Sequence, residues 1–425
     1  MVCSAGAARA NGRFPSASQL VTHPRDHARM LLRTTYGILL TRDGGGHWDW
    51  VCERAVGYGG IEDPAVVITG DGALFAGMFA GLSASTDEGC SWKHAEDLPS
   101  VVVDLALRSP ADTVYAVTGR YAGKGDAGSL FKSELYVAAA AAGADGGKAW
   151  ALRASLDPTL LLESVEVAPS DPQRVYVTAI RDDSRSGGAH GGVLLVSEDD
   201  GRHWLERPVA LEPQERAPFI AAVDPGKPDR VYLRTSGPER NRLLVTDDAG
   251  KTVRTLFTGG ALLGFALSEA GDKVYLGGMT DGLLVASVPE YRFEKRWAMP
   301  VQCLTVVGRT LWACSAPQSG FELGTSEDDG ASFTPRLTLA GMRGPLSCAG
   351  PTSMSKCPLE WDKLQADFGV VKAPAGASSA AAGSTASATS RCGCDVPGRP
   401  VGAGGLLAAL LVGLGASMRR RRRGS

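Results

Sequence analysis

The chain of 425 residues is 44% hydrophobic and 21% charged, which is ordinary for a globular protein, and its 54 glycines and 24 prolines favour a turn-rich, all-β structure. Its formal net charge of −2 includes five arginines near the C-terminus, so the rest of the chain carries −7. This acidic balance excludes a nucleic-acid partner, which requires a basic surface. The sequence shows neither a phosphate-binding glycine loop ahead of a helix nor a zinc-type spacing of cysteine and histidine, so we expect no cofactor and no metal.

Residues 1–18 form an N-terminal extension. They lack the apolar stretch of about 7–15 residues that a secretory signal needs. We interpret the segment Ala5-Gly-Ala-Ala-Arg-Ala10 as the remnant of a signal region behind a truncated gene start. An in-frame hydrophobic segment upstream of Met1 in the genome would support this hypothesis.

An eight-residue pattern, Ser/Thr-x-Asp-x-Gly-x-x-aromatic, recurs along residues 19–340. Four copies are complete, the third lacks the hydroxyl group, and the fifth lacks the aromatic residue. The aspartate, glycine and aromatic positions are, in chain order, Asp43, Gly45 and Trp48; Asp87, Gly89 and Trp92; Asp145, Gly147 and Trp150; Asp199, Gly201 and Trp204; Asp248 and Gly250; and Asp328, Gly330 and Phe333.

Each position of the pattern suits a tight hairpin between two strands. The aspartate carboxylate can accept backbone N–H groups of the turn, and the glycine supplies a positive φ angle that a side chain would penalise. The hydroxyl can hydrogen-bond back across the hairpin, and the aromatic ring can bury against neighbouring strands. The pattern therefore predicts a structural turn.

The spacing of the copies predicts seven units. The pattern aspartates are separated by 44, 58, 54, 49 and 80 residues, and the last gap is long enough to hide a unit. Residues 273–287 in this gap repeat the strand pair that precedes other copies. Six intervals over 285 residues average 47.5, a period typical of propellers and solenoids.

Each unit reads as four short strands. In the fourth unit these are residues 164–169, 174–179, 192–197 and 203–206, which alternate and are rich in β-branched and aromatic residues. No stretch between 19 and 340 has helical periodicity. A small sheet must cover its faces with its neighbours, and a closed ring protects the edges. The sequence therefore predicts a seven-bladed β-propeller of four-stranded blades over residues 19–340.

The repeated pattern resembles the Asp-box, or BNR repeat, of sialidases, sortilin receptors, some glycoside hydrolases and many secreted proteins. The resemblance implies that each copy joins the last two strands of a blade, usually far from the binding centre. Because that family is functionally mixed, the resemblance implies the fold and little about the chemistry.

The nine cysteines favour an oxidising destination. Cys348 and Cys357, in an extension over residues 341–371, are the best disulfide candidates. Cys303 and Cys314 are expected on adjacent strands of the seventh blade, and two further cysteines, Cys52 and Cys90, follow or occupy the patterns of blades one and two. The spacing does not decide the pairing, and reduced, buried thiols are the alternative.

The C-terminal residues read as a sorting signal. Residues 372–391 form a linker rich in alanine, serine and glycine, which we expect to be disordered. The tail, residues 392–425, contains Cys392 and Cys394, then an apolar segment at 401–418, then the arginines of 419–423. Eighteen helical residues cover about 27 Å, enough for a single transmembrane helix across a thin membrane, and the arginines would stay cytoplasmic.

The tail resembles the MYXO-CTERM signal of myxobacterial surface proteins, which combines a cysteine motif, a transmembrane helix and an arginine-rich end. This resemblance implies that Cys392 or Cys394 is processed and becomes the point of attachment to the cell envelope. A permanent membrane anchor is the alternative. Both interpretations predict an exported protein attached to the cell envelope.

Catalytic residues cannot be assigned from the sequence. In Gly12-Arg13-Phe14-Pro15, Arg13 nearly matches an Arg-Ile-Pro motif of sialidases, but no Tyr-Glu nucleophile can be placed, and sialidases have six blades. Another glycosidase would need two carboxylates about 5–10 Å apart. The ligand-binding candidates lie near the starts of first strands, where side chains face the channel, and include rings that could stack on sugars: Tyr58, Glu62, Asp63, Asp104, Tyr121 and Glu163. Solvated acids on the rim and aromatic packing are the alternatives.

The function predicted from the sequence is therefore a non-catalytic, exported binding or scaffold propeller of the cell envelope that recognises a protein or a glycan. The alternative is a glycoside hydrolase, sialidase-like or other, that acts on extracellular glycans. Converging carboxylates with shifted pKa values in a channel-mouth cleft would favour the enzyme.

Overall fold

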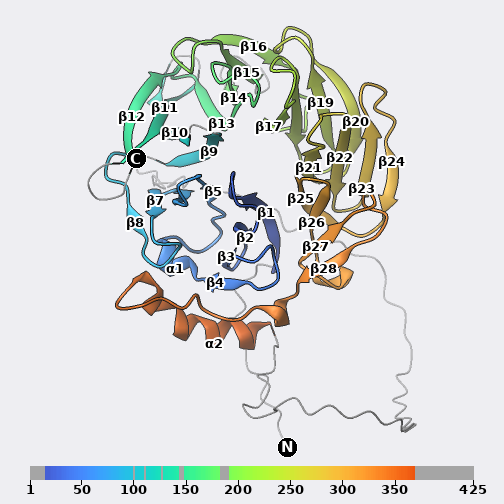
Figure 1. Ribbon diagram of the computed structural model, residues 1–425. Helices are drawn as coiled ribbons and strands as arrows, with labels where there is room; N and C mark the ends of the chain where they lie inside the picture. The colour runs from blue at the N-terminus through green and yellow to red at the C-terminus, as the bar shows by residue number, and fades with distance from the viewer. Residues whose placement is uncertain are drawn as a thin grey trace, which may run out of the picture. The chain divides into compact units, whose positions relative to one another are not determined.

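The computed structural model describes residues 15–98, 101–109, 112–125, 128–142, 148–181 and 191–368. In these ranges 28 strands form seven antiparallel sheets of four strands, and the sheets form a ring (Figure 1). Each sheet contains four strands that are consecutive in sequence. The predicted seven-bladed, all-β propeller is confirmed.

The blades follow the chain in order. Blade 1 contains β1 (Ala17–Thr22), β2 (Met30–Thr34), β3 (Gly37–Thr41) and β4 (Asp49–Val51), and blade 2 contains β5 (Ala65–Ile68), β6 (Leu74–Met78), β7 (Gly81–Ser85) and β8 (Lys93–His94). Blade 3 contains β9 (Val102–Arg108), β10 (Thr113–Lys124), β11 (Ser129–Ala142) and β12 (Lys148–Ser155), and blade 4 contains β13 (Leu160–Val167), β14 (Val175–Arg181), β15 (Gly191–Ser197) and β16 (Leu205–Val209).

The remaining three blades repeat this arrangement. Blade 5 contains β17 (Ala217–Val223), β18 (Val231–Ser236), β19 (Asn241–Thr246) and β20 (Arg254–Gly259), and blade 6 contains β21 (Leu262–Leu267), β22 (Lys273–Gly278), β23 (Gly282–Ser287) and β24 (Glu294–Trp297). Blade 7 contains β25 (Val301–Val307), β26 (Thr310–Ser315), β27 (Leu323–Ser326) and β28 (Thr334–Leu337). The segment 273–287 thus forms the second and third strands of blade 6.

The antiparallel register gives the ring two distinct faces. In blade 1, Ala17 pairs with Thr34, and Ile38 pairs with Val51. The start of β1, the β2–β3 turn and the end of β4 therefore lie at the same face of the ring. We call this the mouth face. The turn from β3 to β4, which contains the repeated pattern, lies at the opposite face, which we call the turn face. All seven blades have this strand order.

Tyrosines on the second strands lock neighbouring blades together. Each one sits in the interface with the next blade and hydrogen-bonds to it. The pairs are Tyr115 with Asp200, Tyr176 with the Pro228 carbonyl (2.7 Å), Tyr232 with Tyr291 (2.9 Å) and Tyr275 with Asp329 (2.5 Å). Because these hydroxyls are satisfied, the rings can be buried between the sheets at little cost in unmet hydrogen bonds.

The ring closes where blade 7 meets blade 1. The Thr305 hydroxyl of β25 donates to the Leu20 carbonyl of β1 at 3.0 Å. The ring of Trp312, on β26, packs against Gly45 in the pattern turn of blade 1. Near this seam the Glu322 carboxylate is 1% exposed, and neither of its oxygens has a hydrogen-bond partner among the described residues. Burial raises the pKa of Glu322 to about 8.

A C-terminal extension covers the outer edge of blade 1 (Figure 1). The Trp50 amide of β4 donates to the Gly344 carbonyl at 2.7 Å, and the Leu346 amide donates to the Trp50 carbonyl at 2.9 Å. Trp50 and Pro345 form a parallel bridge. Arg343 also forms an ion pair with Asp49, at 2.6 Å. The extension therefore adds a short parallel segment to blade 1 and protects the edge of β4.

Two disulfides fix this extension. Cys52 pairs with Cys357 and Cys90 pairs with Cys348, across 305 and 258 residues. Cys348 and Cys357 are thus both in disulfides, but neither is bonded to the other. Cys303 and Cys314, on adjacent strands of blade 7 as expected, form the third bridge of the described residues. Disulfides indicate an exported protein, because cytosolic thiols are kept reduced.

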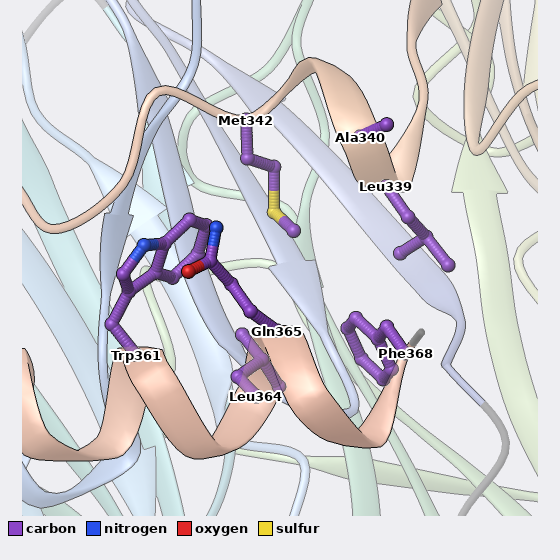
Figure 2. A pocket seen from close by; sticks show the side chains of 7 residues that line it. All are labelled: Leu339, Ala340, Met342, Trp361, Leu364, Gln365 and Phe368. Atoms are coloured by element: carbon purple, nitrogen blue, oxygen red, sulfur yellow. The ribbon is translucent and has the colours of Figure 1, made fainter. Parts of the chain in front are cut away.

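The helices of the structure were not predicted. The short α1 (Glu53–Val56) follows β4, and the 3₁₀ turn η2 (Pro317–Ser319) lies between β26 and β27 of blade 7. After blade 7 come the 3₁₀ turns η3 (Leu339–Gly341) and η4 (Ser353–Lys356) and then α2 (Cys357–Asp367), which ends the extension. Figure 2 shows Trp361, Leu364 and Phe368 of the α2 segment facing Met342. The Trp361 ring lies 5.4 Å from that of Trp50, and the Phe368 ring lies 5.1 Å from that of Tyr36. The helix is therefore held by tertiary packing.

Several predictions fall outside the described residues. These are the role of Arg13, the linker at 372–391, Cys392 and Cys394, the apolar segment at 401–418 and the arginines of 419–423. Within the described ranges, no helix has the length and apolar character needed to cross a membrane.

Candidate functional site in the central channel

The repeated turns form one shared hydrogen-bond pattern in the copies around Asp43, Asp87, Asp199, Asp248 and Asp328. The hydroxyl donates to the aspartate at 2.7–2.9 Å and accepts the glycine N–H at 2.7–3.0 Å. The aspartate also accepts the N–H four residues later, at 2.8–2.9 Å. The hydroxyl thus forms its hydrogen bonds inside the turn. The expected hydrogen bond across the hairpin was wrong.

The pattern glycine has two separate roles. Its φ lies between +81° and +92° in these five copies, and the residue before it is also left-handed, with φ between +53° and +69°. A Cβ on the glycine would also meet a side chain of the preceding blade. The closest approaches are 2.0 Å from Gly330 to Leu283, 2.6 Å from Gly89 to Leu40 and 2.6 Å from Gly201 to Leu135. The glycine therefore allows both the turn and the close packing of two blades.

The turn aspartates are committed to these hydrogen bonds. The Ser332 hydroxyl and amide lower the pKa of Asp328 to about 2, and His47 and His203 hold the pKa values of Asp43 and Asp199 well below the usual range. These carboxylates are ionised and already bonded, so the turns act as structure. Asp145 and Gly147 lie outside the described residues, whereas the Trp150 ring of that copy is buried against Phe75.

A cavity of about 460 Å³ lies in the central channel and is lined by residues of all seven innermost strands. Its ionisable lining residues are Arg33, Asp63, Asp104, Glu163, Glu166 and Arg234. Phe219, Leu263, Phe265 and Leu304 supply the main apolar surface. Arg33 and Arg234 lie near the mouth-face ends of β2 and β18, and Asp63 precedes β5, so the cavity reaches the mouth face. Glu166 and Thr305 lie near the turn-face ends of β13 and β25, so the cavity also extends along the channel.

Blades 3 and 4 supply an acidic wall. The Asp104 carboxylate accepts the Leu105 amide at 2.9 Å and the Val165 amide at 3.0 Å, so it links the two blades. Burial raises the pKa of Asp104 to about 6 and that of Glu163 to about 7, and burial followed by the charge of Asp104 raises the pKa of Glu166 to about 8. Near neutral pH the wall therefore contains both protonated and ionised carboxyl groups.

Two guanidinium groups reach the same cavity from blades 1 and 5. Arg234 donates through Nη1 to the carbonyls of Leu262 (2.5 Å) and Leu263 (3.0 Å). Arg33 donates to the Ser18 hydroxyl at 3.0 Å and to the Pro64 carbonyl at 3.1 Å. Burial, and then the charge of Arg33, lower the pKa of Arg234 to about 10, so Arg234 is still protonated at neutral pH.

The candidates from the sequence separate into two groups. Asp63, Asp104 and Glu163 line the cavity, and their role in binding stays a prediction. Tyr58 is buried in the core beside blade 1, Glu62 accepts the Phe79 amide in a loop, and Tyr121 lies on β10 beside Phe131. These latter three are outside the cavity lining.

Sequence reasoning missed Arg33, Glu166 and Arg234. Glu163 and Glu166 are three residues apart, a spacing that puts side chains on opposite faces of a regular strand. A register shift between Leu162 and Ser164 breaks this alternation. The two arginines are on second strands, where a channel-facing side chain is not expected. An arginine at the mouth-face end of such a strand is the signal that could have found them.

Exposed apolar side chains also gather at the mouth face. Ile61 and Phe79 lie in loops of blade 2, Tyr121 is near the mouth end of β10, Leu263 is at the start of β21, and Met279 is in the β22–β23 turn. Among described residues these are five of the eight large hydrophobic side chains that are exposed; the others are Leu152 and Leu205 on outer strands and Leu359 on α2. The mouth face therefore combines a polar cavity with apolar loops.

Comparison with known proteins supports the fold. No family model matches the chain, and no curated protein matches it. Among solved structures, an ancestral GH74 enzyme aligns with a TM-score of 0.54 and 13% identity over 76% of this chain. The Dos1 propeller aligns with a TM-score of 0.48 and 12% identity over 73% of this chain and 81% of its own. This chain spans 46% of the GH74 structure, and the similarity shows the propeller fold alone.

Proposed function

We propose that this protein is an exported binding or scaffold propeller that holds a protein or glycan ligand at the mouth of its channel. The difference between the two faces carries this proposal. The turn face presents aspartates that are already bonded, whereas the mouth face combines the cavity, its charged groups and most of the exposed apolar side chains. A concave site with a few polar groups and an apolar surround suits ligand binding.

Attachment to the cell envelope is part of the same proposal. It rests on the sequence of residues 392–425, with its cysteines, apolar segment and arginines. The disulfides of the propeller fit an oxidising destination. Two measurements on cells that express the full chain test it. A membrane-impermeant biotin reagent should label the propeller on intact cells, and fractionation should place the protein with the cell envelope.

A glycoside hydrolase is the second candidate. Glu163 and Glu166 keep protons near neutral pH while Asp104 ionises more readily, and a glycosidase needs one carboxylic acid and one carboxylate. We favour binding because both oxygens of the Asp104 carboxylate already accept backbone amides of β9 and β13. The carboxylate therefore has a structural role in joining the two strands. The GH74 similarity supports the fold and does not decide between the two.

A glycan array followed by product analysis tests the proposed function. We expect the full chain to bind without releasing reducing sugar. The double variant Phe79→Ser/Leu263→Ser should weaken binding about 10-fold or more, the size expected for central interface residues. Leu205→Ser is the matched control, since Leu205 is similarly exposed on the outer strand β16. Release of reducing sugar, or equal loss in the control, would contradict the proposal.

A further inference from the structure

Two arginines are fixed in the channel although neither belongs to an innermost strand. Arg33 is on β2 of blade 1, and Arg234 is on β18 of blade 5. Each guanidinium is held by backbone carbonyls near the mouth, from Pro64 in one case and from Leu262 and Leu263 in the other. The charge of Arg33 acts on Arg234, so the two cations lie within electrostatic reach of one another. Their positions are therefore built into the ring.

Arg234 has no carboxylate within ion-pair distance among the residues that the structure describes, and the charge that acts on it is that of Arg33. The hydrogen bonds of its Nη1 go to neutral carbonyls. Arg234 is half-buried, and a partly desolvated cation without an anion partner is less stable than a paired one. The charge of Arg33 adds to this cost, while Arg33 itself also interacts with the charge of Asp104. An anion in the cavity would relieve both effects. Guanidinium groups are also well suited to carboxylates, because they can donate two parallel hydrogen bonds.

The other walls show what kind of molecule can carry that anion. Glu163 and Glu166, partly protonated at neutral pH, can donate hydrogen bonds as well as accept them. Phe219 and Phe265 offer ring surface on the same cavity. The volume of about 460 Å³ lies in the range of small-molecule sites, which is roughly 300–1,000 Å³. Hydroxyl groups, an apolar ring face and a carboxylate are together the chemistry of an acidic sugar.

We propose that Arg33 and Arg234 form an anion site in the channel and that its ligand is an acidic glycan whose carboxylate lies between the two guanidinium groups. This inference rests on the proposed binding function and specifies its ligand. The remaining ionisable groups of the lining, Asp63, Asp104 and the two glutamates, oppose the ligand when they are ionised. Acidification protonates Asp104, Glu163 and Glu166 before it protonates a sugar carboxylate, so binding should be tighter at about pH 5.5 than at about pH 8.

Calorimetry on the full chain tests the inference with a tetrasaccharide of galacturonic acid and a neutral tetrasaccharide of galactose. We expect the acidic probe to bind and Arg234→Gln to weaken it about 10- to 100-fold, the effect of losing a charge-assisted hydrogen bond. Arg33→Gln should act in the same direction. Arg240→Gln is the matched control, because Arg240 is exposed in the β18–β19 turn of the same blade and should leave affinity unchanged.

Three outcomes would overturn the inference. One is equal affinity for the acidic and neutral tetrasaccharides. Another is full affinity for the acidic probe in folded Arg234→Gln, or in folded Arg33→Gln if Arg234→Gln fails to fold. The third is tighter binding of a polyglutamate peptide, which would make the anion that of a protein. If neutral glycans bind and Phe79→Ser/Leu263→Ser abolishes that binding, the acidic ligand is excluded while the proposed function stands.

Discussion

The pattern turns are stabilised by local contacts that repeat from blade to blade, whereas the junction of blade 1 with blade 7 and the extension is stabilised by single contacts between residues far apart in sequence. Each pattern turn completes its hydrogen bonds within eight residues, and the same arrangement recurs in five described copies. The seam and the C-terminal extension depend on contacts that occur once and join residues far apart in sequence. Examples are the Thr305–Leu20 hydrogen bond between blades 7 and 1 and the Cys52–Cys357 bridge between the extension and blade 1. Local repetition therefore shapes the blades, while single, non-local contacts close the ring. The two regions should respond differently to mutation.

Removing the long-range disulfides should have the largest effect. With the nested Cys90–Cys348 bridge intact, the Cys52–Cys357 bridge closes a loop of about 47 residues, which is 38 from Cys52 to Cys90 plus 9 from Cys348 to Cys357. In the chain-entropy model this loop stabilises the fold by about 4 kcal/mol, and the Cys303–Cys314 loop of 11 stabilises it by about 3 kcal/mol. We expect Cys52→Ser/Cys357→Ser to lower the free energy of unfolding more than Cys303→Ser/Cys314→Ser does. Urea titration of both variants measures the difference. Equal losses would show that the bridge between the extension and blade 1 stabilises the fold no more than a local bridge within blade 7.

A glycine substitution in one turn should cost an intermediate amount. Gly330→Ala places a Cβ about 2.0 Å from Leu283 at a φ of +82°, so we expect a loss of roughly 2–4 kcal/mol. Gly44→Ala is the control, since no atom lies within 4 Å of its Cβ position and other copies have glutamate, aspartate or alanine there. It should cost about 1 kcal/mol or less. Similar thermal unfolding of the two variants would argue against the packing role of the glycine.

The buried carboxyl group at the seam should make stability depend on pH. Because folding raises the pKa of Glu322 to about 8, its protonated form favours the fold at low pH, and this contribution is lost as the pH rises through 8. The free energy of unfolding of Glu322→Gln, relative to that of the natural protein, should therefore rise by at least about 2 kcal/mol between pH 5 and pH 8.5. Asp104, Glu163 and Glu166 shift stability in the same direction in both proteins and cancel in the comparison.

Glu327→Gln is the matched control for that measurement. Glu327 is exposed on the same blade and bonds to the Thr310 hydroxyl at 2.7 Å. Its substitution should leave the slope of stability against pH unchanged. A parallel slope for Glu322→Gln and the natural protein would mean that the buried carboxyl group is not protonated in the fold.

The same contrast explains what the sequence could predict. The turns were predictable because the hydroxyl, aspartate and glycine that make them are close in sequence, and their spacing revealed the blade without a copy. The partners of Cys348 and Cys357 were not, because Cys90 and Cys52 come near them only when the ring has closed. α2 was also missed, since its packing against Trp50 and Tyr36 depends on that closure.

The channel was predictable only in part. Asp63, Asp104 and Glu163 stand near the starts of first strands, and propeller geometry brings such positions to the axis. Arg33 and Arg234 reach the axis from second strands through the length of their side chains, which no periodicity encodes. Glu166 joins them through an irregular register in β13. Long side chains and strand irregularities are thus where sequence reasoning failed.

The nested bridges give the protein the topology of two concentric macrocycles. The cycle closed by Cys90 and Cys348 lies inside the one closed by Cys52 and Cys357, and it encloses blades 3 to 7. A single peptide-bond cleavage between positions 91 and 347 therefore cannot release a fragment. A nicked molecule would migrate as one species on a gel until a reducing agent separates it into two.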